Sequence, residues 1–148
     1  MKKLIIAPIT INDINSFDDT EYSNLSNEKR IELINNSQEE SIDGKFFKFY
    51  KILHYNNVVG FLNFYEQSKS VISIAPYIKE NFRQKGFAYS SIIEAHKIVK
   101  SKGFKIALQT VRENNVASIK LHEKLGFELV KKCVSNNNNA IRLYLKIL

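Results

Sequence analysis

The sequence contains one cysteine, no tryptophan and no long hydrophobic run. A single thiol excludes both an internal disulfide and a zinc cluster held by several thiolates. The first apolar stretch turns polar by Thr10, so it is too short for the core of a signal peptide and too short to cross a bilayer. No spacing of His, Asp and Glu resembles a metal site. We therefore expect a soluble, cytoplasmic protein that binds no metal and no membrane.

The length and composition fit one globular domain. The chain has 148 residues, of which 44% are hydrophobic and 25% are charged, which is enough for a full core. The sequence shows no internal repeat, linker or compositional boundary. We expect a single domain over residues 1–148, either as a monomer or as a homodimer.

The charges are unevenly distributed along the chain. The formal net charge is +7, but residues 11–43 contain nine acids and two bases, so this segment carries −7 and the remaining residues carry +14. This separation suggests two different ligand surfaces, although solvated helix faces produce similar blocks. The basic remainder favours polyanionic partners without choosing among nucleic acid, a membrane surface and a phosphorylated cofactor.

The first half of the chain predicts a strand, two polar helices and a three-stranded meander. The helices fall within residues 12–41 and are broken around residues 24–27. Aromatic and β-branched runs then indicate antiparallel strands, with an Asn-rich turn at residues 55–57. The predicted strands cover residues 3–10, 46–54, 58–65 and 70–78.

The second half changes its hydrophobic period. Apolar residues at helical spacing predict a helix over residues 87–102, followed by Gly103 as a left-handed cap. A second helix is predicted from Asn115 to Leu125, with Gly126 at its end. We expect Cys133 to be a small hydrophobe of the core and His96 to lie on the polar side of the first of these helices. The remaining predicted strands cover residues 105–111, 127–134 and 140–147, which gives a mixed α/β fold with helices packed on one sheet.

The segment between the third meander strand and the first long helix has the features of a phosphate-binding loop. A helix start presents unpaired backbone N–H groups and the positive end of the helix dipole. Gly86 lets the backbone approach an anion closely, and Arg83 and Lys85 add positive charge. Taken alone, one glycine and two bases before a helix also fit an ordinary loop.

Two motifs in this order resemble those of the GCN5-related N-acetyltransferase (GNAT) family. The first is the Arg/Gln-x-x-Gly-x-Gly/Ala loop, here residues 83–88. The second is an Asn followed by a helix that ends in a sequence close to Tyr-Glu-Lys-Leu-Gly-Phe, here residues 115–127. The resemblance covers residues 70–129 closely and the first forty residues only in pattern.

The resemblance implies a mostly antiparallel sheet in which two parallel strands splay into a V that holds acetyl-CoA as co-substrate. These strands would end at Ile78 and Val111, at the carboxyl edge where ligands commonly bind. Pantetheine would lie along the backbone around Ile78, and Asn115 would contact the cofactor, although a helix N-cap role fits Asn115 equally. The remaining cofactor-binding residues implied by the resemblance are Arg83, Gln84, Lys85, Gly86, Phe87, Ala88 and Tyr89.

The resemblance also implies that an amine attacks the thioester directly. The backbone N–H of Ile78 would stabilise the oxyanion, and His122 occupies the position at which the family carries a proton-donating Tyr. A Tyr with a pKa near ~10 is protonated at neutral pH, whereas a His near ~6.5 is mostly neutral. His122 could donate a proton if its pKa were raised. Alternatively, it is a buried spacer and a tyrosine replaces it, with Tyr77, Tyr89 and Tyr144 as candidates.

We therefore expect an N-acetyltransferase that acts on a primary amine. The acidic segment at residues 11–43, which forms the acceptor wall in the family, favours a cationic acceptor such as a polyamine, an aminoglycoside, a lysine side chain or a protein N-terminus. A non-catalytic acyl-CoA-binding regulatory module is the alternative, since the family Tyr is absent. Nucleic-acid binding is disfavoured because the bases are scattered and no aromatic-basic platform is present.

Overall fold

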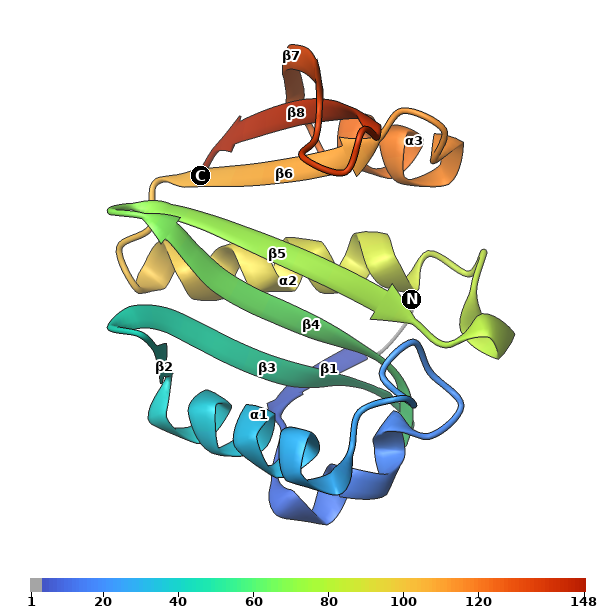
Figure 1. Ribbon diagram of the computed structural model, residues 1–148. Coiled ribbons are helices and arrows are strands. Elements are labelled where there is room, and N and C mark those ends of the chain that lie inside the picture. The colour runs from blue at the N-terminus through green and yellow to red at the C-terminus, as the bar shows by residue number, and fades with distance from the viewer. Residues whose placement is uncertain (1–3) are drawn as a thin grey trace.

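The computed structural model describes residues 4–148, which build one eight-stranded sheet with helices on both faces (Figure 1). The strand order is β1-β3-β4-β5-β6-β8-β7, and the short strand β2 pairs with β3. In the described residues only β5 and β6 pair in parallel. The strands are β1 Leu4–Pro8, β2 Ser41–Ile42, β3 Lys45–His54, β4 Asn57–Ser68, β5 Val71–Ile78, β6 Ile106–Arg112, β7 Glu128–Val134 and β8 Ala140–Ile147. The mixed α/β fold predicted from the sequence is confirmed.

The N-terminal helical region differs in part from the prediction. Its first piece is a 3-10 helix, η1 (Ile11–Phe17), in which the Asp13 carboxylate accepts hydrogen bonds from the backbone N–H and the hydroxyl of Thr10. Its second piece is the α-helix α1 (Asn27–Glu39), whose N-cap Ser26 accepts from the backbone N–H of Lys29. Residue 3 of the predicted first strand lies outside the described residues.

The meander and the later helices lie where the sequence predicts them. Tyr55 and Asn56, between β3 and β4, have φ values of 49° and 68°, as a two-residue hairpin turn requires. The short 3-10 helix η2 (Glu80–Phe82) follows β5, and α2 (Phe87–Ser101) is followed by Gly103 at φ 97°. The last helix, α3 (Val116–Lys124), begins after the N-cap Asn115.

Two hydrophobic cores lie on opposite faces of the sheet. The larger core packs α2 against the central strands, with Phe64, Ile72 and Tyr144 among its fully buried members. The smaller core packs η1 and α1 against β3 and β4 around Phe17, Phe49 and Phe61. Figure 1 shows α1 below the sheet and α2 behind its centre.

Two side chains lie differently from the prediction. Cys133 is only half-buried, because β7 is the edge strand of the sheet and most of its residues are exposed, so its assignment to the core is wrong. His96 is 8% exposed, so it lies against the core rather than on the polar side of α2. Its ring packs 5.7 Å from the ring of Phe127, which closes α2 over the C-terminal strands.

The parallel strands β5 and β6 separate after two paired positions. Val71 pairs with Ile106 and Ile72 with Ala107, and the strands then diverge. Two side chains bridge the point of divergence. The Ser73 hydroxyl donates to the Leu108 carbonyl at 2.6 Å, and the Gln109 side-chain oxygen accepts from the Ile74 N–H at 3.3 Å. These bonds replace backbone pairing and hold the strands at the start of a V.

No helix in residues 4–148 is long and apolar enough to cross a membrane. In the same residues, no cluster of three or more His, Cys, Asp or Glu side chains is arranged to hold a metal ion.

Candidate active site

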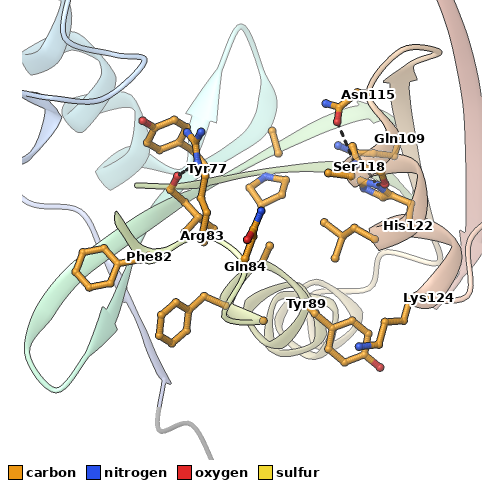
Figure 2. A pocket seen from close by; sticks show the side chains of 18 of the residues that line it. Tyr77, Phe82, Arg83, Gln84, Tyr89, Gln109, Asn115, Ser118, His122 and Lys124 are labelled. Carbon is orange, nitrogen blue, oxygen red and sulfur yellow. Dashed lines mark hydrogen bonds between the residues drawn. The ribbon is translucent and has the colours of Figure 1, made fainter. Parts of the chain in front are cut away.

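A cleft of about 860 Å³ opens where β5 and β6 diverge (Figure 2). One wall is the end of β5 and the loop that leads into α2. The opposite wall is β6 and α3. The residues that line the cleft include Ile78, Arg83, Gln84, Gly86, Phe87, Ala88, Tyr89, Asn115 and His122. The structure thus brings nine of the ten residues singled out in the sequence into one cavity. Lys85 is the exception, because it is not part of the lining, although its ammonium lies 5.9 Å from the ring centre of the lining residue Phe82.

The end of β5 turns its backbone polar groups toward the cleft. Lys79 donates its N–H to Val59 of β4 at 2.8 Å, and alternate residues of a strand point in opposite directions, so the N–H of Ile78 points away from β4 toward the cleft. Pro76, two residues earlier on the same side, has no N–H to leave unpaired. The V therefore exposes backbone groups of β5 at the place where a bound chain could pair with them.

The start of α2 has the geometry of an anion site. The N-cap residue Gly86 has φ 80° and Gln84 has φ 61°, so two residues of this short loop are left-handed. No side chain caps the helix. The first backbone N–H groups of α2 therefore face the cleft together with the positive end of the helix dipole. Lys124 of α3 adds a positive charge nearby, with its ammonium 4.4 Å from the ring centre of Tyr89.

Asn115 lines the cleft and also caps α3. Its side-chain oxygen accepts the N–H of Ser118 at 3.1 Å. The helix N-cap role considered for Asn115 is therefore present in the structure, on the wall of the cavity.

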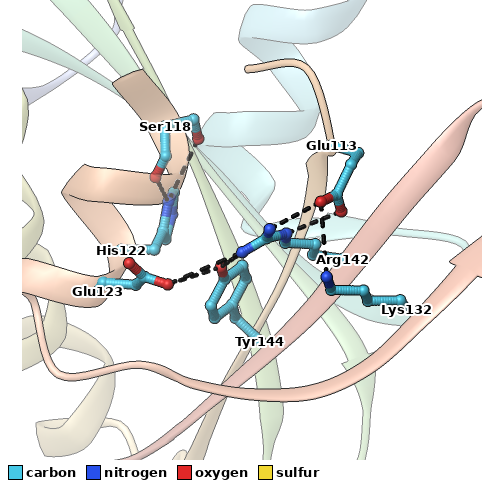
Figure 3. Close-up of polar contacts among 7 residues, drawn as sticks. All are labelled: Glu113, Ser118, His122, Glu123, Lys132, Arg142 and Tyr144. Carbon is cyan, nitrogen blue, oxygen red and sulfur yellow. Dashed lines mark hydrogen bonds and ion pairs between the residues drawn. The ribbon is translucent and has the colours of Figure 1, made fainter. Parts of the chain in front are cut away.

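His122 lies in the opposite wall and is contacted by Ser118, Phe127 and Tyr144, of which Figure 3 shows Ser118 and Tyr144. Its Nδ1 lies 2.8 Å from the Ser118 carbonyl, and because a carbonyl only accepts, Nδ1 carries the proton in the neutral ring. Phe127 meets the ring edge-on at 5.1 Å and Tyr144 stacks at 6.4 Å. His122 is 2% exposed, and this burial lowers its pKa below the ordinary value, against the smaller opposing effect of the Ser118 hydrogen bond. Nε2 is thus the unprotonated nitrogen of a neutral imidazole.

Among the tyrosines considered as proton donors, Tyr144 is turned away from the cleft. Its hydroxyl accepts from Arg142 and donates to Glu123, both at 3.2 Å, and Tyr144 is not part of the cleft lining. Arg142 is held in turn by Glu113 through two hydrogen bonds of 2.7 and 2.8 Å (Figure 3). Tyr144 therefore supports the ring of His122, whereas Tyr77 and Tyr89 lie in the lining.

The acidic segment contributes one carboxylate to the described lining of the cleft, that of Glu21. Asp13 and Asp18 are instead paired with Lys51 and Arg30, each at 2.9 Å. Glu21 lies beside Tyr22, and the pKa of the Tyr22 phenol is raised by burial and by the charge of Glu21. Charge counting found the segment but did not distinguish Glu21 from the other acids.

Sequence reasoning also missed Gln109, Thr110 and Lys124, which line the cleft. The sequence did contain one signal for the open side of β5. Pro76 lies within this strand, and a proline within a strand indicates that one side of the strand is unpaired at that point.

Comparisons with known proteins agree with this geometry. A sequence model described as "Acetyltransferase (GNAT) family" matches residues 11–127. No curated protein sequence matches the chain. Similar solved structures include an N-acetyltransferase from Staphylococcus aureus Mu50, with 19% identity, 98% of each chain covered and a TM-score of 0.77. A second is an acetyl transferase from Salmonella typhimurium that modifies the N-terminal serine of ribosomal protein L7/L12, with 16% identity, 100% and 96% coverage and a TM-score of 0.80.

A third similar structure is spermidine N-acetyltransferase from Vibrio cholerae in complex with CoA and spermine. The two sequences are 15% identical, the match covers 97% of this chain and 95% of the Vibrio cholerae chain, and the TM-score is 0.79. At these identities the likeness establishes the fold, while the match to the sequence model establishes the family.

Proposed function

Because the chain belongs to the acetyltransferase (GNAT) family, we propose that it transfers the acetyl group of acetyl-CoA to a primary amine of a cationic acceptor. The observation that carries this proposal is the cleft itself. It connects an uncapped helix start, which suits phosphates, with a wall to which Glu21 contributes an exposed carboxylate.

The residues of the cleft fit acetyl-CoA. The backbone N–H groups from Gln84 to Tyr89 would hold the pyrophosphate, because they converge with the dipole of α2 and need no dedicated side chain. The backbone of β5 near Ile78 would pair with the amides of pantetheine, and Asn115 would contact the same arm from α3. Acetyl-CoA then supplies a thioester as the acetyl donor.

The chemical step places the acceptor amine against the thioester carbonyl. As the amine attacks, negative charge develops on the carbonyl oxygen, and the N–H of Ile78 would donate to it from a fixed backbone position. A donor fixed in advance needs little reorganisation during the reaction. The end of β5 therefore contributes both to cofactor binding and to catalysis.

His122 would carry protons in both directions. The attacking amine must lose a proton and the departing thiolate must gain one. A neutral imidazole with a free Nε2 can accept the first proton and then deliver a proton to the thiolate. The sequence suggested that His122 donates a proton to the thiolate if its pKa is raised, but burial lowers the pKa of His122 instead. The order in which His122 acts is therefore base first and acid second.

Glu21 would select cationic acceptors at its side of the cleft. It is exposed, so an ion pair with an incoming ammonium contributes modestly and weakens with salt. Polyamines, aminoglycosides, lysine side chains and protein N-termini all carry the required charge and amine. The Vibrio cholerae structure contains spermine and the Salmonella typhimurium protein modifies an N-terminal serine, and both acceptor types agree with the proposal.

The acceptor class is tested with Glu21→Gln. We expect kcat/KM for spermidine to fall by about two- to fivefold, the range of an exposed ion pair. The kcat/KM for a neutral primary amine, meaning one with no positive charge besides the reacting amine, should stay the same. Glu28→Gln on α1 is the matched control, because Glu28 lies outside the cleft lining. Equal losses for the cationic and the neutral amine in Glu21→Gln would refute selection by charge.

A further inference from the structure

Arg83 lies against the end of β5, although its sequence position is in the phosphate loop. Its Nε donates to the Ile78 carbonyl at 2.9 Å, and its guanidinium carbon lies 5.6 Å from the ring centre of Tyr77. Figure 2 shows the guanidinium beside Tyr77, across the cleft from Tyr89 and Lys124. Neither partner is charged, so the positive charge of Arg83 is not neutralised by these contacts.

The partners of Arg83 together have the chemistry of a cation site. A carbonyl oxygen and an aromatic face are the groups that bind ammonium and guanidinium ions. Tyr77 is fixed by Tyr22, whose ring meets it edge-on at 5.9 Å, and Glu21 beside Tyr22 adds a negative charge. An arginine of the chain itself therefore fills the position that best suits a cationic acceptor.

We propose that the Ile78 carbonyl and the Tyr77 ring form a cation subsite of the acceptor site, which Arg83 occupies in the free protein and leaves when CoA binds. The proposal rests on the proposed function, because it takes the phosphates of CoA to bind at the start of α2. Arg83 is three residues before Gly86, the N-cap of α2, so a swing of its exposed side chain can bring the guanidinium to these phosphates.

Phosphate is the stronger partner for this side chain. A guanidinium binds phosphate through charged, bidentate hydrogen bonds, which exceed one bond to a neutral carbonyl and an exposed cation–π contact. Occupation of the phosphate site thus frees the subsite for the acceptor. Because coupling between two ligands is reciprocal, the acceptor in turn tightens the binding of CoA.

Titration calorimetry with CoA and spermidine tests the subsite without turnover, since CoA carries no acetyl group. In the wild type, saturating CoA should lower the Kd of spermidine by about three- to tenfold, the range expected when a competing cation–π contact is removed. Arg83→Gln should bind spermidine more tightly by the same factor without CoA, and CoA should then add little. A wild-type Kd in Arg83→Gln, with the CoA effect retained, would overturn the proposal.

Lys85→Gln is the matched control for charge. It removes one positive charge from the same loop, but Lys85 lies against Phe82 and not in the subsite. We expect Lys85→Gln to bind spermidine without CoA as the wild type does. If Lys85→Gln tightens spermidine binding as much as Arg83→Gln, long-range repulsion explains the effect and the subsite is refuted.

The NMR signal of the Arg83 Nε–H separates this proposal from the proposed function. The signal should report a hydrogen-bonded group in the free protein and should move when CoA is added. Binding of CoA without any change in this signal would overturn the subsite and leave the proposed function intact. Absence of CoA binding would refute both the proposed function and the displacement of Arg83.

Discussion

His122 is the residue on which the proposed chemistry depends most. Its orientation is set by Ser118 four residues earlier, by Phe127 after the helix and by Tyr144 on β8. Tyr144 is fixed in turn by Arg142 and Glu123. A side chain in contact with three residues moves little, so the ring of His122 keeps one orientation in the wall of the cleft.

Replacing His122 separates catalysis from binding. His122→Phe should lower kcat by at least about tenfold, because removing a positioned acid–base group typically costs ~10²–10⁴-fold. The Kd of acetyl-CoA should stay within about twofold, since the proposed cofactor contacts lie mainly on β5 and α2. His122→Tyr should restore part of the rate, because a phenol can supply the proton to the thiolate. Full turnover in His122→Phe would show that His122 is a spacer.

The pH dependence of the reaction gives a second signature of His122. The ring must be neutral to accept a proton, and burial lowers its pKa below the ordinary value of about 6.5. Activity should therefore persist down through pH 6.5 and fall only at lower pH, where the ring becomes protonated. The residual activity of His122→Phe should lack this acidic limb. If the activity of His122→Phe falls at acidic pH in the same way as that of the wild type, the fall belongs to another group.

His96 predicts an acid-dependent loss of stability. Burial lowers the pKa of His96 to about 4, with smaller contributions from Lys146 and His122, whereas the unfolded chain has a value near 6.5. Between these values the unfolded state binds more protons, so the free energy of unfolding should fall as pH decreases from about 6.5 to about 4. His96→Phe should flatten this part of the curve, and His54→Gln, at a less buried histidine, is the control. If the free energy of unfolding depends on pH equally in the wild type and in His96→Phe, the loss of stability in acid is not caused by His96.

Among the elements, β4 and β5 leave no room for a side chain at Gly60. A Cβ at this position would lie 2.1 Å from the Tyr77 carbonyl oxygen and 3.0 Å from the Ile78 Cα. Both contacts are with backbone, so the end of β5 would have to move. This glycine therefore permits the approach that sets the position of Ile78 in the cleft.

Gly60→Ala should affect both stability and binding. We expect a loss of about 1–3 kcal/mol in the free energy of unfolding from overpacking, together with weaker binding of acetyl-CoA. Gly44→Ala is the control, because a Cβ there meets nothing within 4 Å and only its left-handed φ of 78° adds strain. Denaturant unfolding and calorimetry provide the two measurements. Unchanged acetyl-CoA affinity in Gly60→Ala would show that cofactor binding does not depend on the position of Ile78.

The elements also show how far the sequence could predict the structure. Strong local signals, such as the Asn-rich turn at Asn56 and the cap at Gly103, located β3, β4 and α2 correctly. The exposed setting of Cys133 could not be predicted, because an edge strand and a central strand share the same alternating pattern. The burial of His96 was missed for a related reason, since it depends on Phe127, a distant residue that packs against α2.

The candidate site was predictable where motif and element coincide. The loop at residues 83–88 and the helix at residues 115–125 are local patterns, and both lie in the cleft. The side-chain direction of Arg83 was not predictable, because it depends on the carbonyl of Ile78 and the ring of Tyr77. The bridge from Gln109 to Ile74 likewise joins two strands that are distant in sequence.

Across the whole molecule, the acidic and basic regions meet at the cleft. The segment at residues 11–43 places Glu21 at one side, while the start of α2 and Lys124 lie at the other. Several acids of this segment are used for structure, as in the pair of Asp13 and Lys51. The molecule therefore carries a negative group on one side of the cleft and positive groups on the other, which agrees with the proposed binding of an amine and of phosphates. The single-domain organisation and the cytoplasmic location stay predictions.

The most direct test of the account is amine-dependent release of thiol from acetyl-CoA by the purified protein. We predict that spermidine and other cationic primary amines accelerate thiol release above the rate with acetyl-CoA alone, and that mass spectrometry finds the acetylated amine. Gly86→Glu should abolish both signals, because it places a carboxylate where the pyrophosphate would bind. If acetyl-CoA binds to the wild type but no amine of a broad panel increases thiol release, the chain is an acyl-CoA-binding module and the proposed activity is wrong.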